Sequence, residues 1–203
     1  NSPCYLSTYV FPTKKTAIVD NIPFDIDNPK DLKISYEATR RLKEHLDNLG
    51  IPNIVVFSGR NGFHVYEFIK PSSDISQCDI RNIQYNQLEM SGVGFRTVDG
   101  SPTRSSNLVP AIMSQTLGRF RQLMRIPTTK YVKNNYSNGY YCRYIPDSDF
   151  RRGLEHIKHI SKEPGEMPPY LTSTFTHKDI WDMLGEERHK LSYFPCEIEY
   201  TNG

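Results

Sequence analysis

The sequence predicts an α/β fold in which helices pack against a β-sheet. The first observation is residues 22–27, where apolar and polar residues alternate as in a strand with one buried face. The second is residues 31–49, whose apolar residues recur every three or four positions, as on one face of a helix. The third is the apolar run at residues 54–57, which predicts a buried strand connected by a glycine-containing turn to a returning strand at residues 64–69. The predicted order is therefore strand, helix, strand, turn, strand.

The elements around this unit follow from local patterns. Residues 5–11 favour a short strand, and residues 16–19 a second one. After the unit we expect a helix at 76–90 and a loop at 91–107. A basic and apolar segment at 117–126, a polar turn at 134–139 and a strand at 140–145 follow. The last expected elements are helices at 149–160 and 176–184 and an extended end at 191–200. A linker is predicted at 161–169, so we expect a main catalytic domain over residues 1–160 and a C-terminal extension over 161–203 that packs on it.

The composition is that of a globular protein. A chain of 203 residues forms one compact domain with two halves, or two small domains. Apolar residues at 37% and charged residues at 24% exclude a disordered or fibrous class. No apolar run approaches the ~20 residues of a membrane helix, and no signal peptide opens the chain, so we expect a cytoplasmic protein with no membrane partner. Because the chain begins at Asn1 without Met, we expect an excised or processed domain.

Charge and cysteine content restrict the function further. A net charge of +2 does not by itself indicate a nucleic-acid partner. A local cluster of basic and aromatic residues does suit a phosphate backbone with stacked bases, and the alternative is a solvated basic face. Its members are Arg119, Arg121, Arg125, Lys130, Tyr131, Lys133 and Tyr136. The four cysteines are scattered without a CxxC pair, which disfavours a zinc ribbon and favours buried free thiols over a disulfide or a split metal site.

Two carboxylates in the strand at residues 22–27 are candidate metal ligands. Asp25 and Asp27 are two positions apart, so both side chains point to the same face of a sheet. Two acids placed side by side repel each other unless a cation lies between them. Phe24 and Ile26 bury the other face of the strand and hold the acids rigidly. The alternative is a pair of surface acids at a strand end.

The turn at residues 58–62 offers groups suited to an anion. Its amides, including that of Gly59, together with Arg60 and His64, are donors for phosphate oxygens. An ordinary hairpin turn is the alternative, because Asn-Gly is a strong turn signal. The alternative does not explain why a turn that holds Ser58 and Arg60 leads directly into a histidine. Metal ligands beside phosphate ligands predict a site for a nucleoside triphosphate.

Three blocks of sequence stand in a fixed order. They are FDID at residues 24–27, SGRNGFHVY at residues 58–66 and RFRQLMRIPTT at residues 119–129. Together they resemble motifs of the archaeo-eukaryotic primase superfamily, which includes small primase subunits, primase-polymerases and the polymerase domains of bacterial end-joining ligases. The likeness spans roughly residues 5–146. It implies a primase-type fold, a mixed sheet with flanking helices and a second half like an RNA-recognition motif.

The resemblance also implies roles for individual residues. Asp25 and Asp27 would hold Mg²⁺ or Mn²⁺. Ser58, Gly59, Arg60 and His64 would bind the triphosphate of the incoming nucleotide, and Arg125 and Lys133 would lie near the nucleotide or template. The reaction would be attack of a 3′-hydroxyl on an α-phosphate, with Asp25, Asp27 and His64 as the catalytic set.

One position departs from the family pattern. The family has a third acid about fourteen residues before the proline of its third block, and counting back from Pro127 reaches Met113. A thioether does not replace a carboxylate for a hard cation. Three interpretations stay open: Asp99 or Asp79 supplies the acid, the chain carries a substitution, or the protein is a degenerate family member.

The resulting functional prediction is a DNA primase or primase-polymerase that makes or extends primers on single-stranded DNA. Its partners would be nucleoside triphosphates, template and primer, and possible further partners are a helicase or another replication subunit outside this chain. Its location would then include a nucleoid or a viral replication site. One alternative is a silent homologue that binds nucleotide or nucleic acid without turnover, which Met113 favours. Another is a metal-dependent phosphoesterase that uses Asp25 and Asp27 for hydrolysis.

Overall fold

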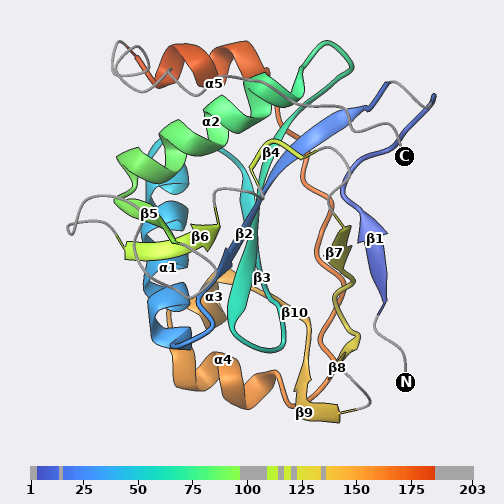
Figure 1. The fold of residues 1–203 in the computed structure, drawn as a ribbon, viewed down its shortest axis with the longest axis vertical. Coiled ribbons are helices and arrows are strands. Elements are labelled where there is room, and N and C mark those ends of the chain that lie inside the picture. The colour runs from blue at the N-terminus through green and yellow to red at the C-terminus, as the bar shows by residue number, and fades with distance from the viewer. Residues whose placement is uncertain are drawn as a thin grey trace.

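A four-stranded antiparallel sheet forms the centre of the protein, as seen in a computed structural model that describes residues 4–13, 16–96, 109–113, 117–119, 123–133 and 136–185. Its strands stand in the order β10-β3-β4-β2. Their bounds are Arg143–Ile145 for β10, Asn53–Phe57 for β3, Gly62–Ser72 for β4 and Val19–Asp27 for β2. Helices α1 (Leu32–Asn48) and α2 (Gln77–Met90) lie on the same side of this sheet (Figure 1). The predicted order of strand, helix, strand, turn and strand is confirmed.

The sheet buries one face beneath these helices. Phe24 of β2 lies opposite Val65 of β4, and Val65 lies opposite Val55 of β3. All three are at most 1% exposed and belong to one hydrophobic core with α1 and α2. Because neighbouring residues of a strand point to opposite faces, Asp25 and His64 point away from this core. The register therefore confirms the predicted alternation of residues 22–27.

Shorter strand pairs complete the structure. Strand β1 (Tyr5–Ser7) pairs with β7 (Leu123–Arg125), and β8 (Lys130–Lys133) pairs with β9 (Tyr136–Tyr141), all antiparallel. In Figure 1 these strands lie on the side of the central sheet away from α1. Strand β5 (Val93–Arg96) pairs in parallel with β6 (Val109–Met113), and β6 lies against α1 and β2. Parallel and antiparallel pairing thus both occur, in separate sheets, and the fold is mixed α/β. The half resembling an RNA-recognition motif stays a prediction.

Helix boundaries match the predicted ones where capping signals are strong. Asp31 caps α1, with its carboxylate accepting from the amide of Lys33, and Ser76 caps α2 in a reciprocal capping box with Asp79. The predicted helix at 149–160 is instead two helices, α3 (Asp147–Phe150) and α4 (Leu154–Ile160). Gly153 separates them at φ 92°, a left-handed conformation that ends a helix. The predicted turn at 134–139 is also wrong from residue 136 onward, where β9 begins.

The chain after α4 packs on the same core. The amide of Lys70 donates to the carbonyl of Phe175, and the ring of Tyr170 meets Phe68 edge-on. The last described helix, α5 (His177–Met183), buries Ile180 completely. The linker and the boundary at residue 160 stay predictions, and the extended end predicted at 191–200 lies outside the described residues.

Two further expectations concern the cysteines and membranes. Cys142 is a buried free thiol, as predicted, whereas Cys4 is free but exposed. Cys78 is disulfide-bonded, so the prediction of free thiols is wrong for it. Among the described residues, no helix combines the length and the apolar character needed to cross a bilayer.

Candidate functional site

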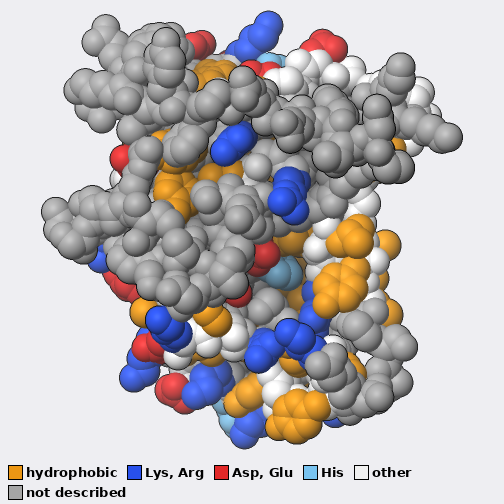
Figure 2. All heavy atoms as spheres, viewed as in Figure 1, with side chains coloured by type: hydrophobic (Ala, Val, Ile, Leu, Met, Phe, Trp, Pro, Cys, Tyr) orange, Lys and Arg blue, Asp and Glu red, His pale blue; other side chains and the backbone are white. Residues whose placement is uncertain are grey.

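The carboxylate pair and the histidine share the sheet face that points away from α1 and α2. Asp25 lies opposite His64 across β2 and β4, and Asp27 lies opposite Gly62. The Nε2 atom of His64 is 3.9 Å from Oδ1 of Asp25; the side chains of His64 and Asp25 are 7% and 36% exposed. Figure 2 shows red and pale-blue side chains next to each other in the middle of the face it views, with blue side chains above and below. This surface therefore presents acidic, imidazole and basic groups together.

Gly62 allows the two strands to approach closely beside the acids. A Cβ atom at this position would lie 2.2 Å from the carbonyl oxygen of Ile26 and 2.6 Å from Cβ of Asp27. Both distances are far below van der Waals contact, and the first atom belongs to the backbone. The glycine therefore determines how closely β4 lies against the strand that carries Asp27.

The turn between β3 and β4 is attached to its surroundings by hydrogen bonds. The amide of Ser58 donates to the carbonyl of Gly62 at 3.0 Å, which closes the turn. The carbonyl of Asn61 accepts from the hydroxyl of Ser35 in α1 at 2.6 Å. The guanidinium of Arg60 extends from this turn and donates from Nη1 to the hydroxyl of Tyr131 in β8 at 2.8 Å. The turn is thus held against both α1 and β8.

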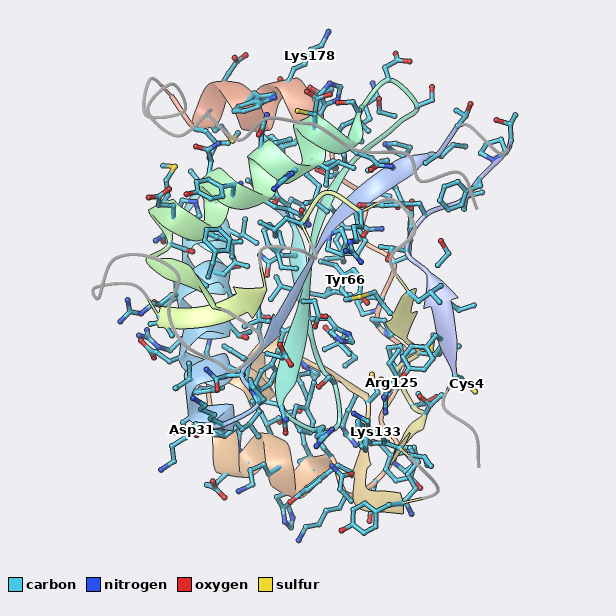
Figure 3. The ribbon with its side chains drawn as sticks, viewed as in Figure 1. Cys4, Asp31, Tyr66, Arg125, Lys133 and Lys178 are labelled. Carbon is cyan, nitrogen blue, oxygen red and sulfur yellow. The ribbon has the colours of Figure 1, made fainter. Side chains whose placement is uncertain are left out.

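Arg125 brings the third sequence block to the same site. It is 9% exposed, and its Nη2 donates to the hydroxyl of Tyr5 at 2.9 Å. Its guanidinium carbon lies 4.3 Å from the ring centroid of Tyr131 and 5.3 Å from that of Tyr5. Figure 3 places Arg125 on the side of the sheet where β7 and β8 lie, and Tyr66 on the side of β4 that faces them.

Two buried nitrogens in this site have no hydrogen-bond partner. They are Nδ1 of His64 and Nη1 of Arg125, each without a partner in the described part of the chain. Buried polar atoms are nearly always hydrogen-bonded, and an unsatisfied one needs a specific explanation. Each of the two nitrogens therefore lacks, among the described residues, the hydrogen bond that its burial calls for.

The histidine is uncharged at neutral pH. Burial, and next the positive charge of Arg125, lower the pKa of His64 from 6.5 to about 4. A neutral imidazole donates from one nitrogen and accepts at the other. Burial also raises the pKa of the Cys142 thiol to about 12, so this neighbour of Arg125 is not a nucleophile.

Lys133 belongs to β8, the strand that also carries Tyr131. It is exposed on β8, opposite Tyr136 of β9. Lys130 of the same strand has its ammonium 5.7 Å from the ring centroid of Tyr141. The β8–β9 ribbon therefore exposes basic and aromatic side chains next to the site, and the role of Lys133 stays a prediction.

The described residues contain no third acid beside the pair. Within them, no group of three or more histidine, cysteine or acidic side chains is placed to hold a metal ion. Met113 ends β6, and its backbone pairs with that of Arg96. Since β6 lies against β2, position 113 belongs to a strand next to the one that carries the acids. The carboxylate of Asp79 accepts from Ser76 in its capping box, and Asp99 lies outside the described residues.

Tyr131 and Tyr5 are site residues that the sequence did not assign. The basic–aromatic cluster predicted above includes Tyr131, but no spacing rule connects it to Arg60, which is 71 positions away. Tyr5 stands in a short predicted strand whose partner was unknown. Both tyrosines are nevertheless connected to the third block: β1 pairs with β7 inside it, and β8 begins directly after it.

No family model matches the sequence, and no curated protein does. Among solved structures, the fold is similar to the polymerase domain from Mycobacterium tuberculosis Ligase D in complex with DNA. The TM-score is 0.46 and the sequence identity is 13%. The match covers 93% of this chain but 60% of that one.

Proposed function

We propose that the chain is a primase-polymerase catalytic domain that adds nucleotides to a primer on a single-stranded DNA template. The observation that carries this proposal is the position of His64, which lies 3.9 Å from Asp25 and close enough to Arg125 for that charge to act on it. These residues come from three sequence blocks, and each block resembles a different motif of the primase superfamily. Segments far apart in the chain thus supply carboxylate, imidazole and guanidinium to one site.

The basic side of the site suits the triphosphate of an incoming nucleotide. The unpartnered Nη1 of Arg125 and Nδ1 of His64 are oriented by Tyr5, Tyr131 and the sheet before any ligand binds. Arg60, with the hydroxyl of Ser58 and the amide of Gly59, adds donors from the turn. Groups oriented in advance lose little entropy on binding. Because the imidazole is neutral, it contributes a hydrogen bond to phosphate without a charge of its own.

The acidic side suits a divalent cation. Asp25 and Asp27 are oxygen ligands on one sheet face, both are partly exposed, and Mg²⁺ and Mn²⁺ prefer such ligands. In the proposed site these two residues would hold the ion. When bound, the ion would supply positive charge that favours attack of the primer 3′-hydroxyl on the α-phosphate and departure of pyrophosphate.

The nucleic-acid partners follow from the same proposal. Template and primer are polyanions with exposed bases, and the β8–β9 ribbon next to the site offers Lys130, Lys133 and the exposed ring of Tyr136. A helicase or another replication subunit would bind elsewhere. The catalytic domain would end near residue 160, with the following segment packed on it.

A silent homologue is the second candidate, and the residue at position 113 favours it. In a strand next to the acids, the chain has methionine where the family has its third acid. Two carboxylates hold a cation less firmly than three. A protein of this kind would bind nucleotide and DNA with little or no turnover.

A primer-extension assay with Mn²⁺ tests the proposal. Wild type should extend a labelled primer on single-stranded DNA, and the double variant Asp25→Ala, Asp27→Ala should not, although it unfolds at the same denaturant concentration or a higher one. The double variant Asp74→Ala, Glu155→Ala, which removes two exposed acids elsewhere, should extend like wild type. Activity retained without Asp25 and Asp27 would refute the metal assignment.

Calorimetry separates the two candidates. Nucleotide binding by a wild-type protein that makes no product would support the silent homologue. Neither product nor nucleotide binding would refute both.

A further inference from the structure

We propose that Tyr131 is a positioning residue that holds Arg60 and Arg125 together as a receptor for the polyphosphate of the nucleotide. The proposal rests on the function proposed above and adds a residue to it. Tyr131 is 8% exposed and lies in β8, while the two arginines come from the turn after β3 and from β7. Three segments therefore meet at one aromatic ring.

The hydroxyl of Tyr131 fixes Arg60. It accepts a hydrogen bond from Nη1 at 2.8 Å, and the guanidinium carbon lies 5.5 Å from the ring centroid. Arg60 is otherwise an exposed side chain on a turn. A long exposed side chain samples many rotamers, and this hydrogen bond restricts Arg60 to those that face the site.

The ring of Tyr131 fixes Arg125. Its centroid lies 4.3 Å from the guanidinium carbon, which is close for a cation on an aromatic face. On the same guanidinium, Nη2 donates to Tyr5, whose ring centroid is 5.3 Å away. The guanidinium of Arg125 is thus held against two rings and uses Nη2 for a hydrogen bond. Its buried Nη1 has no partner in the described residues.

The occupant that this arrangement favours is an anion with several negative charges. The two guanidinium groups beside the Tyr131 ring carry like charges and repel each other. An anion bound between them would attract both and offset that repulsion. Guanidinium groups bind phosphate oxygens through pairs of directed hydrogen bonds, unlike the single point charge of lysine. His64 lies beside Arg125 with its own unpartnered nitrogen, so the receptor continues toward Asp25. A triphosphate is long enough to contact several of these groups.

Because Tyr131 acts through the two arginines, its loss should affect binding rather than chemistry. Removing the hydroxyl releases Arg60 only, whereas removing the ring releases both arginines. The variants Tyr131→Phe and Tyr131→Leu therefore form a graded series. The matched pair Tyr170→Phe and Tyr170→Leu changes a tyrosine that is 68% exposed in the segment after α4.

The test measures binding of inorganic triphosphate by calorimetry without divalent cations, and KM and kcat for nucleotide in primer extension. We expect Tyr131→Phe to raise Kd and KM roughly tenfold, the worth of one hydrogen bond from a charged donor. Tyr131→Leu should raise both by a further factor of about five, since the cation–aromatic contact is lost. The value of kcat should change less than twofold for Tyr131→Phe, and both Tyr170 variants should match wild type.

A double-mutant cycle with Arg60→Gln decides the mechanism even if Tyr131→Leu does not fold. If Tyr131 acts through Arg60, Tyr131→Phe should add nothing to the effect of Arg60→Gln on the Kd for triphosphate. Additive effects, or a Tyr131→Phe variant that binds triphosphate like wild type, would overturn the inference. If wild type binds neither triphosphate nor nucleotide, the proposed function fails as well. Nucleotide binding that is normal in wild type and in both Tyr131 variants refutes the positioning role alone.

Discussion

The imidazole of His64 stands 3.9 Å from the carboxylate of Asp25 and remains neutral at neutral pH. A protonated histidine would form an ion pair with that acid and reduce its charge. Burial and the nearby charge of Arg125 prevent this by lowering the pKa of His64 to about 4. The acid therefore keeps its negative charge for a cation, and the imidazole keeps a hydrogen bond for phosphate.

Replacing His64 should weaken nucleotide binding more than template binding. We expect His64→Ala to raise the KM for nucleotide by roughly tenfold, since one buried hydrogen bond to a charged ligand is worth about 1.5 kcal/mol or more. Steady-state extension with varied nucleotide gives KM, and fluorescence anisotropy gives template affinity. His159→Ala, an exposed histidine in α4, is the control. An unchanged KM for nucleotide in His64→Ala would contradict the triphosphate role.

Replacing Gly62 should disturb the acid pair without changing any charge. In Gly62→Ala the new Cβ collides with the carbonyl of Ile26 and with Asp27, so the ends of β2 and β4 must separate. We expect a loss of about 2 kcal/mol in the free energy of unfolding. Mn²⁺ binding, measured by calorimetry, should weaken at least severalfold.

Asn61→Ala is the neighbouring control for this change. It keeps the backbone carbonyl that accepts from Ser35, so it should leave the free energy of unfolding and the Mn²⁺ affinity unchanged. If Gly62→Ala matched Asn61→Ala in stability and in Mn²⁺ affinity, the close approach of the strands would not be what positions Asp27.

The sequence predicted those parts of the fold that depend on local signals. The helix from Asp31 to Leu49 has a capping acid at one end and an apolar stripe, and the structure differs by one residue at each end. The shared face of Asp25 and Asp27 followed from the period of a strand, which tertiary contacts do not alter. The break at Gly153 was missed because the apolar stripe continues across it.

The sequence did not predict how distant segments meet. Nothing local indicates that β1 pairs with β7 and so brings Tyr5 to Arg125. The contact of Tyr131 with Arg60 depends on how β8 packs beside the turn after β3, and that packing comes from the whole fold. The two acids and His64 were predictable as a set because they lie on two strands, β2 and β4, that pair with each other. The contacts of the two arginines with tyrosine rings were not predictable, because they join segments that are far apart in the chain.

Introducing an acid at position 113 tests the alignment with the primase family. If that position corresponds to the family's third acid, Met113→Asp adds an oxygen ligand next to β2 and should raise Mn²⁺ affinity about tenfold. Primer extension should rise as well. Met113→Asn has a similar size without the charge and should resemble wild type. Equal Mn²⁺ affinity in the two variants would show that the third acid belongs elsewhere in the chain.

A buried acid on the opposite face of the sheet should give the protein a distinctive dependence of stability on pH. Glu67 in β4 is fully buried, its Oε1 accepts from Gln87 at 3.2 Å, and its Oε2 has no partner among the described residues. Burial raises the pKa of Glu67 from 4.5 to about 8, so the folded protein holds a proton that the unfolded chain releases above pH 4.5. The contribution of protonated Glu67 to the free energy of unfolding is therefore fully present below about pH 4.5. It is lost as the pH rises through 8.

The variant Glu67→Gln imitates the protonated form and should remove this loss. Urea unfolding of both proteins between pH 5 and 8 should give similar free energies at the acidic end, and the variant should be more stable at pH 8 by on the order of 3 kcal/mol. The lowered pKa of His64 has the opposite effect, because it makes the protein less stable as the pH falls from 6.5 towards 4. This effect is the same in wild type and in Glu67→Gln, so it cancels when their free energies of unfolding are subtracted. Glu155→Gln, at an acid whose side chain is 78% exposed, should leave the curve unchanged. Parallel curves for wild type and Glu67→Gln would mean that Glu67 is ionised in the folded protein at neutral pH.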